Sequence, residues 1–313
     1  SNRKTTPYMI EFRPIRLEDR PVIERYTMPS GICNCDLAFA NMFCWQSVYH
    51  SAWAEIDGFL VIRFHIDGGE RIGYMQPVGE GDFGPIVPLL REDAHAHGQR
   101  LRIIGLTDEG CETIRRMHAG QFAFESDRAL EDYVYRADDL RNLTGRRYQP
   151  KRNHINRFVE NNPTWTYEEI TPATLPECLE MDKEWYRRSL QREGDAEERD
   201  LGDEGIALRT AMEHYEELGL EGGLIRVYGE VVAFTIGDRL SADTYDVHFE
   251  KAYGELQGAY AMINREFARW VRARHPEIRY LNREDDMGVE GLRKAKQSYY
   301  PDLMVEKHTA VMK

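Results

Sequence analysis

A nine-residue pattern occurs twice in the chain, once in each half. Asp108-Glu-Gly-Cys-Glu-Thr-Ile-Arg-Arg116 and Asp286-Met-Gly-Val-Glu-Gly-Leu-Arg-Lys294 both read D-x-G-x-E-x-(I/L)-R-(R/K). Each copy follows a short apolar segment, 101–105 in the first half and 278–281 in the second, that is typical of a buried strand. Self-similarity at this separation indicates two copies of one structural unit. We therefore expect the chain to fold as a duplication.

The same order of strands and helices is predicted around both copies. Short apolar segments bounded by turn residues predict strands, and longer amphipathic segments predict helices. The predicted strands are 12–15, 59–64, 74–78, 101–105 and 122–124, then 224–227, 231–236, 246–249, 278–281 and 304–311. The predicted helices are 19–26, 86–97 and 108–117, then 174–192, 204–218, 259–273 and 289–299. The expected fold class is α/β (α+β), with two units that are each a mixed, mainly antiparallel sheet flanked by helices.

This order of elements predicts the domain organisation. We expect a first unit at 1–137, a basic helix between the units at 138–164, and a second unit at 165–313. The acidic, apolar-poor stretch 193–205 is expected to be a mobile loop inside the second unit.

The composition argues against several classes of protein. A net charge of −13 disfavours broad non-specific binding to nucleic acid or to an anionic membrane. No apolar run approaches the roughly 20 residues of a membrane span, so we expect a cytoplasmic protein. The five cysteines are expected as reduced thiols, and their spacing matches no zinc motif. No metal-ligand set or nucleophilic triad is visible, and no cofactor is indicated with certainty.

A glycine-rich loop in the first half resembles a dinucleotide-binding motif. Residues 79–84 fit G-x-G-x-x-G between a predicted strand and a predicted helix. A Rossmann site also needs an acidic residue at the end of the next strand, which here ends in Gly105. Glu80 and Asp82 would repel phosphate. We therefore favour a structural loop, in a first unit that is a degenerate copy.

The segment between Asp139 and Glu160 is strongly basic. It contains no acid and six cationic residues, which are Arg141, Arg146, Arg147, Lys151, Arg152 and Arg157. In an acidic chain this indicates a binding site for a polyanion, such as a tRNA backbone or a CoA phosphate, with Arg147, Lys151, Arg152 and Asn153 as the predicted contacts. The alternative is a helix that pairs with the protein's own surplus carboxylates. Both interpretations stay open.

Several short segments resemble one protein family. They are Phe12-Arg-Pro-Ile15, Cys35-Asp36, Phe39-Ala-Asn41, Asp132-Tyr133, Tyr148-Gln-Pro-Lys-Arg-Asn153, His154-Ile-Asn-Arg-Phe158 and His248-Phe-Glu250. Over nearly its whole length the chain resembles the family grouped with the C-terminal domain of phosphatidylglycerol lysyltransferase. This resemblance implies two tandem GNAT-like units, as in the Fem-type aminoacyltransferases. It also implies aminoacyl-tRNA or acyl-CoA as the donor substrate.

The resemblance places a donor cleft in the second unit. Backbone amides of the splayed strand near Val247 and Phe249 would stabilise an oxyanion. The donor's phosphates would rest at the start of the next helix, where free N–H groups favour anions; its residues are Gln257, Gly258, Ala259 and Tyr260. Glu255 and Tyr260 stand where the GNAT pattern has Arg or Gln and a small residue, which slightly favours aminoacyl-tRNA over CoA. The alternative role for Gly258 is tight packing at a helix start.

Candidate catalytic residues follow the strand 278–281. Glu284 or Asp285 would accept a proton from an attacking amine, whereas Asp286 is better placed to cap the next helix. The resemblance implies that Tyr299 or Tyr300 protonates the leaving group. The predicted function is transfer of an acyl or aminoacyl group to an amine or hydroxyl, with a small molecule, a peptide or a lipid headgroup as acceptor. The alternative is a non-catalytic binding protein that retains the same scaffold.

Overall fold

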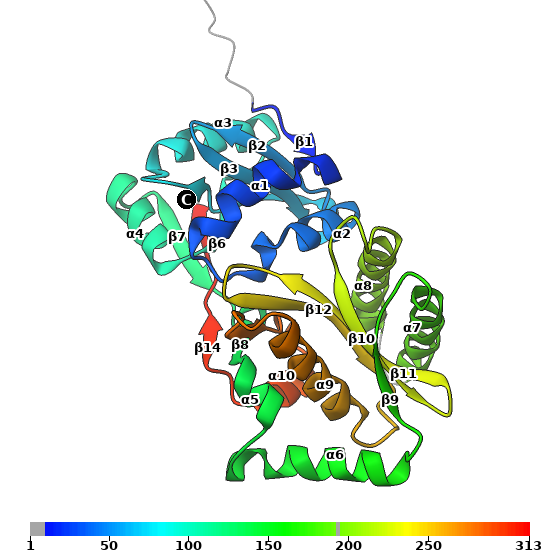
Figure 1. The fold of residues 1–313 in the computed structure, drawn as a ribbon. Coiled ribbons are helices and arrows are strands. Elements are labelled where there is room, and N and C mark those ends of the chain that lie inside the picture. The colour runs from blue at the N-terminus through cyan, green and yellow to red at the C-terminus, as the bar shows by residue number, and fades with distance from the viewer. Residues whose placement is uncertain (1–9, 192–194) are drawn as a thin grey trace, which may run out of the picture. The chain divides into compact units, whose positions relative to one another are not determined.

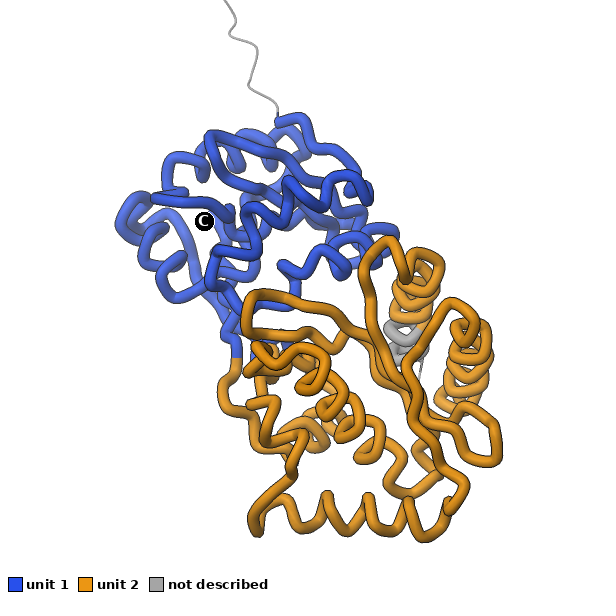
Figure 2. The backbone as a smooth tube through the Cα atoms, viewed as in Figure 1, with its two compact units in different colours: residues 1–131, 305–313 blue, residues 132–304 orange. Residues whose placement is uncertain are grey.

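Each of two β-sheets is the centre of one unit of the chain. The computed structural model describes residues 10–191 and 195–313 (Figure 1). Unit 1 contains the chain up to Glu131 together with 305–313, and unit 2 contains 132–304 (Figure 2). The predicted boundary at 137 and the assignment of everything from 165 to 313 to the second unit therefore differ from the observed division at both ends of unit 2.

Unit 1 is a mixed sheet with helices packed against it. Its described strands are β1 (Arg13–Pro14), β2 (Ala52–Ile56), β3 (Phe59–Ile66), β4 (Arg71–Met75), β5 (Val78–Gly79), β6 (Arg102–Leu106), β7 (Phe122–Ser126) and β15 (His308–Met312). Its described α-helices are α1 (Arg20–Thr27), α2 (Phe39–Tyr49), α3 (Val87–Ala96) and α4 (Asp108–Met117). Its core joins the buried faces of this sheet and of α3, with Leu90 and Ile103 fully buried.

Unit 2 has the same kind of architecture. Its described strands are β8 (Asp132–Arg136), β9 (Thr166–Glu169), β10 (Glu221–Val227), β11 (Glu230–Arg239), β12 (Thr244–Ala252), β13 (Tyr280–Asn282) and β14 (Leu303–Val305). Its described α-helices are α5 (Ala137–Asn142), α6 (Gln149–Asn161), α7 (Leu175–Leu190), α8 (Asp195–Glu213), α9 (Ala259–Arg274) and α10 (Glu290–Gln297). Helix α9 contributes the apolar side of its surface, including Met262 and Phe267, to the main core.

The two sheets repeat one strand order. Unit 1 runs β1-β2-β3-β4-β6-β15-β7 and unit 2 runs β9-β10-β11-β12-β13-β8-β14. Neighbours in these orders are antiparallel wherever a pairing register is given, except for β4 with β6 and β12 with β13, which are parallel and occupy the same position in the two sheets. The mixed, mainly antiparallel class and the duplication inferred from the sequence therefore agree with the structure.

The sixth strand of each sheet comes from the other half of the chain. Strand β15, the last in the chain, pairs antiparallel with both β6 and β7 of unit 1. Strand β8 comes directly after the other first-half strands in the sequence, but it lies between β13 and β14 of unit 2. The closing strand that the sequence analysis placed in the second unit thus completes the first sheet. The halves exchange their final strands.

Two local predictions differ from the structure. The single basic helix at 138–164 is two helices of unit 2, α5 and α6, separated where Leu143 and Gly145 have positive φ. The loop expected at 193–205 is helical from Asp195 onward, and 193 and 194 lie outside the described residues. Among the helices that are described, none has both the length and the apolar character needed to cross a membrane.

Candidate active site

Strands β12 and β13 pair briefly and then separate. Their parallel register runs from Thr244 opposite Tyr280 to Asp246 opposite Asn282. Strand β13 ends there, whereas β12 continues to Ala252. Beyond this point, the residues after Asp246 still belong to strand β12, whereas the residues after Asn282 belong to a loop. Strand β12 thus continues beyond its pairing with β13 through Val247 and Phe249, where the sequence resemblance implied a splayed strand.

His248 lies in a bulge of β12 just beyond this point. Val247 is opposite Gly237 and Phe249 is opposite Ile236 on β11, so His248 is the extra residue between two paired positions. Bulges redirect side chains and are frequent beside active sites. The His248 side chain is only 1% exposed. The strand therefore holds one imidazole in a fixed, buried position.

Three carboxylates surround the imidazole of His248. Nε2 lies 2.5 Å from Asp238 Oδ1, and Nδ1 lies 2.8 Å from Asp246 Oδ2 and 3.2 Å from Glu284 Oε2. Burial alone would lower the pKa of His248, but Asp246 and then Asp238 outweigh it and hold this pKa well above its usual value. Burial, followed by repulsion from Glu284, raises the pKa of Asp246 well above its usual value. Both shifts favour the protonated forms of these two groups.

Glu284 is the outward member of this cluster. Its side chain is 21% exposed, against 0% for Asp246. Its ligand atom and those of Asp246 and His248 all lie within 4.8 Å of one another, so the same set has the chemistry to hold a divalent metal ion. Glu284, which the sequence analysis named as a catalytic candidate, thus belongs to a polar cluster. The sequence analysis did not name Asp246 or His248 as site residues.

The loop that carries Glu284 is held in an unusual backbone conformation. Glu284 has a φ of 63°, and its N–H donates to Asn282 Oδ1 at 2.8 Å. The buried ammonium of Lys296 donates to the carbonyl oxygens of Arg283 and Asp285, at 2.6 and 2.5 Å. Positive φ at a non-glycine residue stores strain that the surroundings must hold. Lys296 supplies that constraint, which positions the Glu284 carboxylate.

The predicted tyrosines lie in other surroundings. Tyr299 is buried in the main core of unit 2, with Lys151 Nζ 4.1 Å from its ring centre. Burial raises the pKa of Tyr299 above its usual value. Tyr300 is exposed, with its ring edge-to-face against Tyr148. Arg283 Cζ lies 5.8 Å from the centre of the Tyr299 ring, so Tyr299 is near the residue before Glu284. A role of either tyrosine in protonating a leaving group stays a prediction.

Asp286 anchors its loop more than it caps a helix. Its carboxylate accepts hydrogen bonds from Tyr133 Oη at 2.6 Å, from Gly288 N at 2.8 Å and from Arg293 Nε at 2.9 Å. Helix α10 begins at Glu290 after Val289. The bond from Tyr133 ties the exchanged strand β8 to the repeated motif of unit 2.

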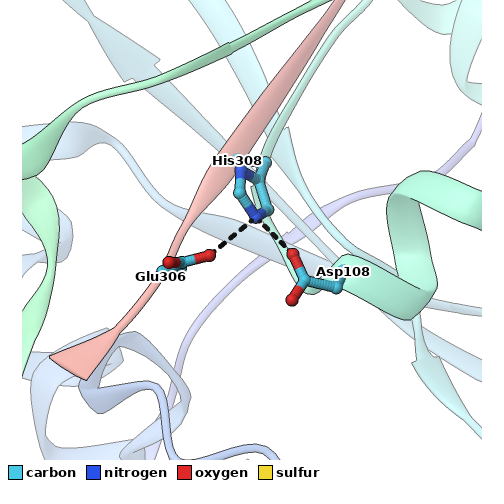
Figure 3. A group of neighbouring side chains, drawn as sticks. All are labelled: Asp108, Glu306 and His308. Carbon is cyan, nitrogen blue, oxygen red and sulfur yellow. Dashed lines mark hydrogen bonds and ion pairs between the residues drawn. The ribbon is translucent and has the colours of Figure 1, made fainter. Parts of the chain in front are cut away.

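The corresponding aspartate of unit 1 also contacts an exchanged strand (Figure 3). His308 Nε2, on β15, lies 2.7 Å from Asp108 Oδ1 and 3.5 Å from Glu306 Oε2. The side chains of Asp108 and Glu306 are 77% and 61% exposed. These three groups also have metal-ligand chemistry. In contrast to the His248 cluster, their carboxylates are largely hydrated.

The repeated glycines differ in conformation. Gly110 is inside the first turn of α4, where an added Cβ would lie 2.1 Å from Gln76 Oε1. Gly288 precedes α10 and has a φ of 75°. Both lie near helix starts, but their helical positions are not equivalent. The loop at 79–84 is a structural turn, in which Asp82 accepts from Gly84 N and pairs with Arg116.

The predicted donor loop is packed against α6. Gly258 has a φ of 83°, and an added Cβ would lie 2.3 Å from the carbonyl oxygen of His154 and 2.9 Å from Phe158 Cβ. The hydroxyl of Tyr260 accepts from Trp185 Nε1 at 3.1 Å, and Glu255 pairs with Arg188. Packing therefore explains Gly258. Phosphate contacts by Gln257, Gly258, Ala259 and Tyr260, and oxyanion contacts at Val247 and Phe249, stay predictions.

Replacing Gly258 by alanine should lower stability markedly. The new methyl group would meet backbone and adopt a disfavoured φ, each of which typically costs on the order of 1–3 kcal/mol. Gly145→Ala is the matched control, because its φ is 90° but an added Cβ meets nothing within 4 Å. Denaturant unfolding should show a clearly larger loss for Gly258→Ala. Equal losses would contradict the packing role.

The basic residues are divided between internal and exposed positions. Lys151 Nζ donates to Ser298 Oγ at 2.6 Å, and burial lowers its pKa. Arg152 donates to the carbonyl oxygens of Leu143 and Gly145. Arg147 pairs with Asp139 at 3.9 Å and is half exposed, and Asn153 accepts from Gln149 Nε2. Lys151 and Arg152 therefore have structural roles, and polyanion binding by this segment stays a prediction.

Comparisons with known proteins agree with this architecture. The family model described as "Phosphatidylglycerol lysyltransferase, C-terminal" matches residues 31–311. A solved structure of a conserved protein of unknown function from Bacteroides thetaiotaomicron VPI-5482 is 42% identical, with a TM-score of 0.90, and the alignment covers 97% of this chain and 100% of that one. No curated protein matches the chain.

Two more distant structures share the fold. L-PGS from Bacillus licheniformis is 14% identical with a TM-score of 0.66, over 96% of this chain and 93% of that one. A tandem GNAT protein from the clavulanic acid biosynthesis pathway is 12% identical with a TM-score of 0.52, over 96% and 98%. The fold class predicted from the sequence, two tandem GNAT-like units, is confirmed.

Proposed function

Because the chain belongs to the family of the phosphatidylglycerol lysyltransferase C-terminal domain, we propose that unit 2 transfers an acyl or aminoacyl group to an amine. The observation that carries the proposal is Glu284 beside His248 where β12 and β13 separate. Fold likeness alone would be a weak argument for activity. The local geometry is a stronger argument. Glu284 has a strained backbone and a partly exposed carboxylate, and it contacts the buried groups Asp246 and His248, whose pKa values are raised. Perturbed pKa values are frequent at functional sites.

Glu284 has the position and the partners of a proton carrier. A neutral acceptor amine attacks the donor carbonyl carbon, so that a C–N bond forms and the bond from carbon to the carrier oxygen or sulfur breaks. The nitrogen loses a proton to Glu284, and Glu284 then returns that proton to the leaving oxygen or sulfur. His248 and Asp246 stay behind it as a buried proton reservoir. Such general acid–base action typically contributes about 10²–10⁴-fold to a rate.

An aminoacyl ester of tRNA fits the surroundings better than CoA does. The helix start at Gly258 is covered by α6, and Glu255 is near it. Two exposed arginines, Arg146 and Arg157, lie on or next to α6. They offer a polyanion positive charge without breaking the internal bonds of Lys151 and Arg152. Counterion release would make such binding strongly salt-dependent.

Glu284→Gln should lower the rate of transfer by about 10²-fold or more, because the amide cannot take up the proton. Transfer is measured from charged tRNA and from acetyl-CoA to a mixture of amines, at two salt concentrations. Glu290→Gln, an exposed acid at the start of α10, is the control and should transfer normally. Unchanged transfer by Glu284→Gln would overturn the proton-carrier role. Transfer from acetyl-CoA alone would overturn the choice of donor.

A further inference from the structure

A small cavity between α7, α8 and β12 is separate from the His248 cluster. Its volume is about 170 Å³, and its charged lining consists of Asp182, Lys183, Glu204, Arg209 and Lys251. This is smaller than the roughly 300–1,000 Å³ typical of sites for drug-sized ligands. Any ligand that it encloses is therefore small.

Asp182 enters this cavity without a partner. It is 6% exposed, and among the described residues it makes no hydrogen bond or ion pair. Burial raises the pKa of Asp182 although Lys251 and Arg209 lower it. An unpaired buried carboxylate is costly, and nearly all buried polar groups have a partner. A ligand with a cationic or hydrogen-bond-donating group would supply one.

Arg209 presents the opposite charge to the same cavity. Within the part of the chain whose side chains are described, its guanidinium forms no hydrogen bond or ion pair. Lys251 differs, because its ammonium pairs with Glu204 and lies 3.7 Å from the centre of the Trp185 ring. The cavity thus combines one buried acceptor with one planar donor that binds carboxylates in a bidentate manner.

The cavity opens on the same face of the sheet as His248. Tyr245, Val247 and Ala252 belong to the core formed with α9. Side chains alternate along a strand, so Asp246 and Lys251 point to the opposite face, and the bulge residue His248 pairs with Asp246 there. On that face Lys251 contacts Glu204 of α8 and Trp185 of α7. Three residues of strand span roughly 10 Å. A small molecule held beside Lys251 would therefore lie near the proposed proton carrier.

We propose that this cavity binds a small α-amino acid, with its ammonium on Asp182 and its carboxylate on Arg209. Two unpaired groups of opposite sign in one small cavity match a zwitterion better than a simple amine or a simple acid. That this amino acid is the acceptor of the transfer rests on the proposed function. Binding itself does not depend on that function.

The test is calorimetric titration of the full chain with L-alanine. L-Alanine should bind, whereas propionate and ethylamine, which each keep one of its two charges, should bind at least tenfold more weakly. Asp182→Asn and Arg209→Gln should each weaken L-alanine binding at least tenfold. Glu180→Gln is the control and should bind normally, since Glu180 is an exposed residue of the same helix that does not line the cavity.

Two further measurements separate a binding role from a structural one. Asp182→Asn removes an unpaired buried charge, so its melting temperature should be equal to or above that of the wild type. Glu284→Gln should bind L-alanine normally even where transfer is lost, which distinguishes failure of this site from failure of the proposed function. Equal binding of ethylamine and L-alanine would overturn the proposal. So would unchanged binding by Asp182→Asn, or binding of long basic amino acids alone.

Discussion

A chain that ends at Met304 should lose the fold of unit 1 while unit 2 stays folded. Strand β15 supplies hydrogen bonds to β6 on one side and to β7 on the other, and Ala310 is fully buried between them. Its removal leaves two unpaired edges and opens the core of that sheet. A domain is stable by only about 5–15 kcal/mol, so the loss of an interior strand should exceed the margin of unit 1.

Hydrogen exchange measures this result strand by strand. Amides of β6 and β7 should lose their protection, whereas amides of β11 and β12 should keep theirs. Removal of Lys313 alone is the control and should change little. A synthetic peptide of residues 305–313, added in excess, should restore protection in unit 1. Loss of protection in unit 2 instead would contradict the exchange of final strands.

This exchange shows what the sequence could and could not predict. Short apolar segments bounded by turn residues and the repeated motif were enough to predict most of the strands and the duplication, because they depend on local sequence. Strands β2 and β9 were not predicted. The apolar residues within 304–311 predict a strand but do not tell which strand it joins. Both β8 and β15 have the same position in equivalent sheets, so their patterns fit either partner. Only the three-dimensional pairing distinguishes them.

The sequence analysis identified one of the four residues of the His248 cluster. Glu284 was found because it follows a short buried strand, where rigid placement is expected. Asp238, Asp246 and His248 were missed, since a cluster drawn from two strands and a loop has no fixed spacing in the sequence. One signal was present: Asp246 and His248 are titratable residues two positions apart within the predicted strand 246–249. Alternation places both on one face, which for buried residues calls for a partner.

His248→Gln should destabilise unit 2 by about 3–5 kcal/mol near neutral pH. The wild-type imidazolium is the shared partner of Asp238, Asp246 and Glu284, and removing one member of a buried charge group leaves the others uncompensated. Glutamine is similar in size and neutral, so the loss is mainly electrostatic. Denaturant unfolding of both proteins, at several pH values, gives the difference.

The pH dependence identifies the cause of that loss. The folded-state pKa of His248 is raised, so its contribution is complete below its unfolded pKa of about 6.5 and is lost as the pH rises through the folded value. In the variant, the raised pKa of Asp246 rises further without the imidazolium. A carboxyl group whose pKa is higher in the folded than in the unfolded state makes the folded protein more stable as the pH falls. The variant should therefore recover much of its loss as the pH is lowered toward 4.

His308→Gln is the matched control in unit 1. His308 also contacts two carboxylates, Asp108 and Glu306, but these are largely exposed (Figure 3). Water already compensates such charges, so this substitution should cost about 1 kcal/mol or less and show little dependence on pH. Equal and small losses for the two variants would mean that the His248 cluster is not a charged, proton-holding centre. A large, pH-dependent loss of unfolding free energy for His248→Gln alone would support a buried, protonated imidazole that can take part in proton transfer.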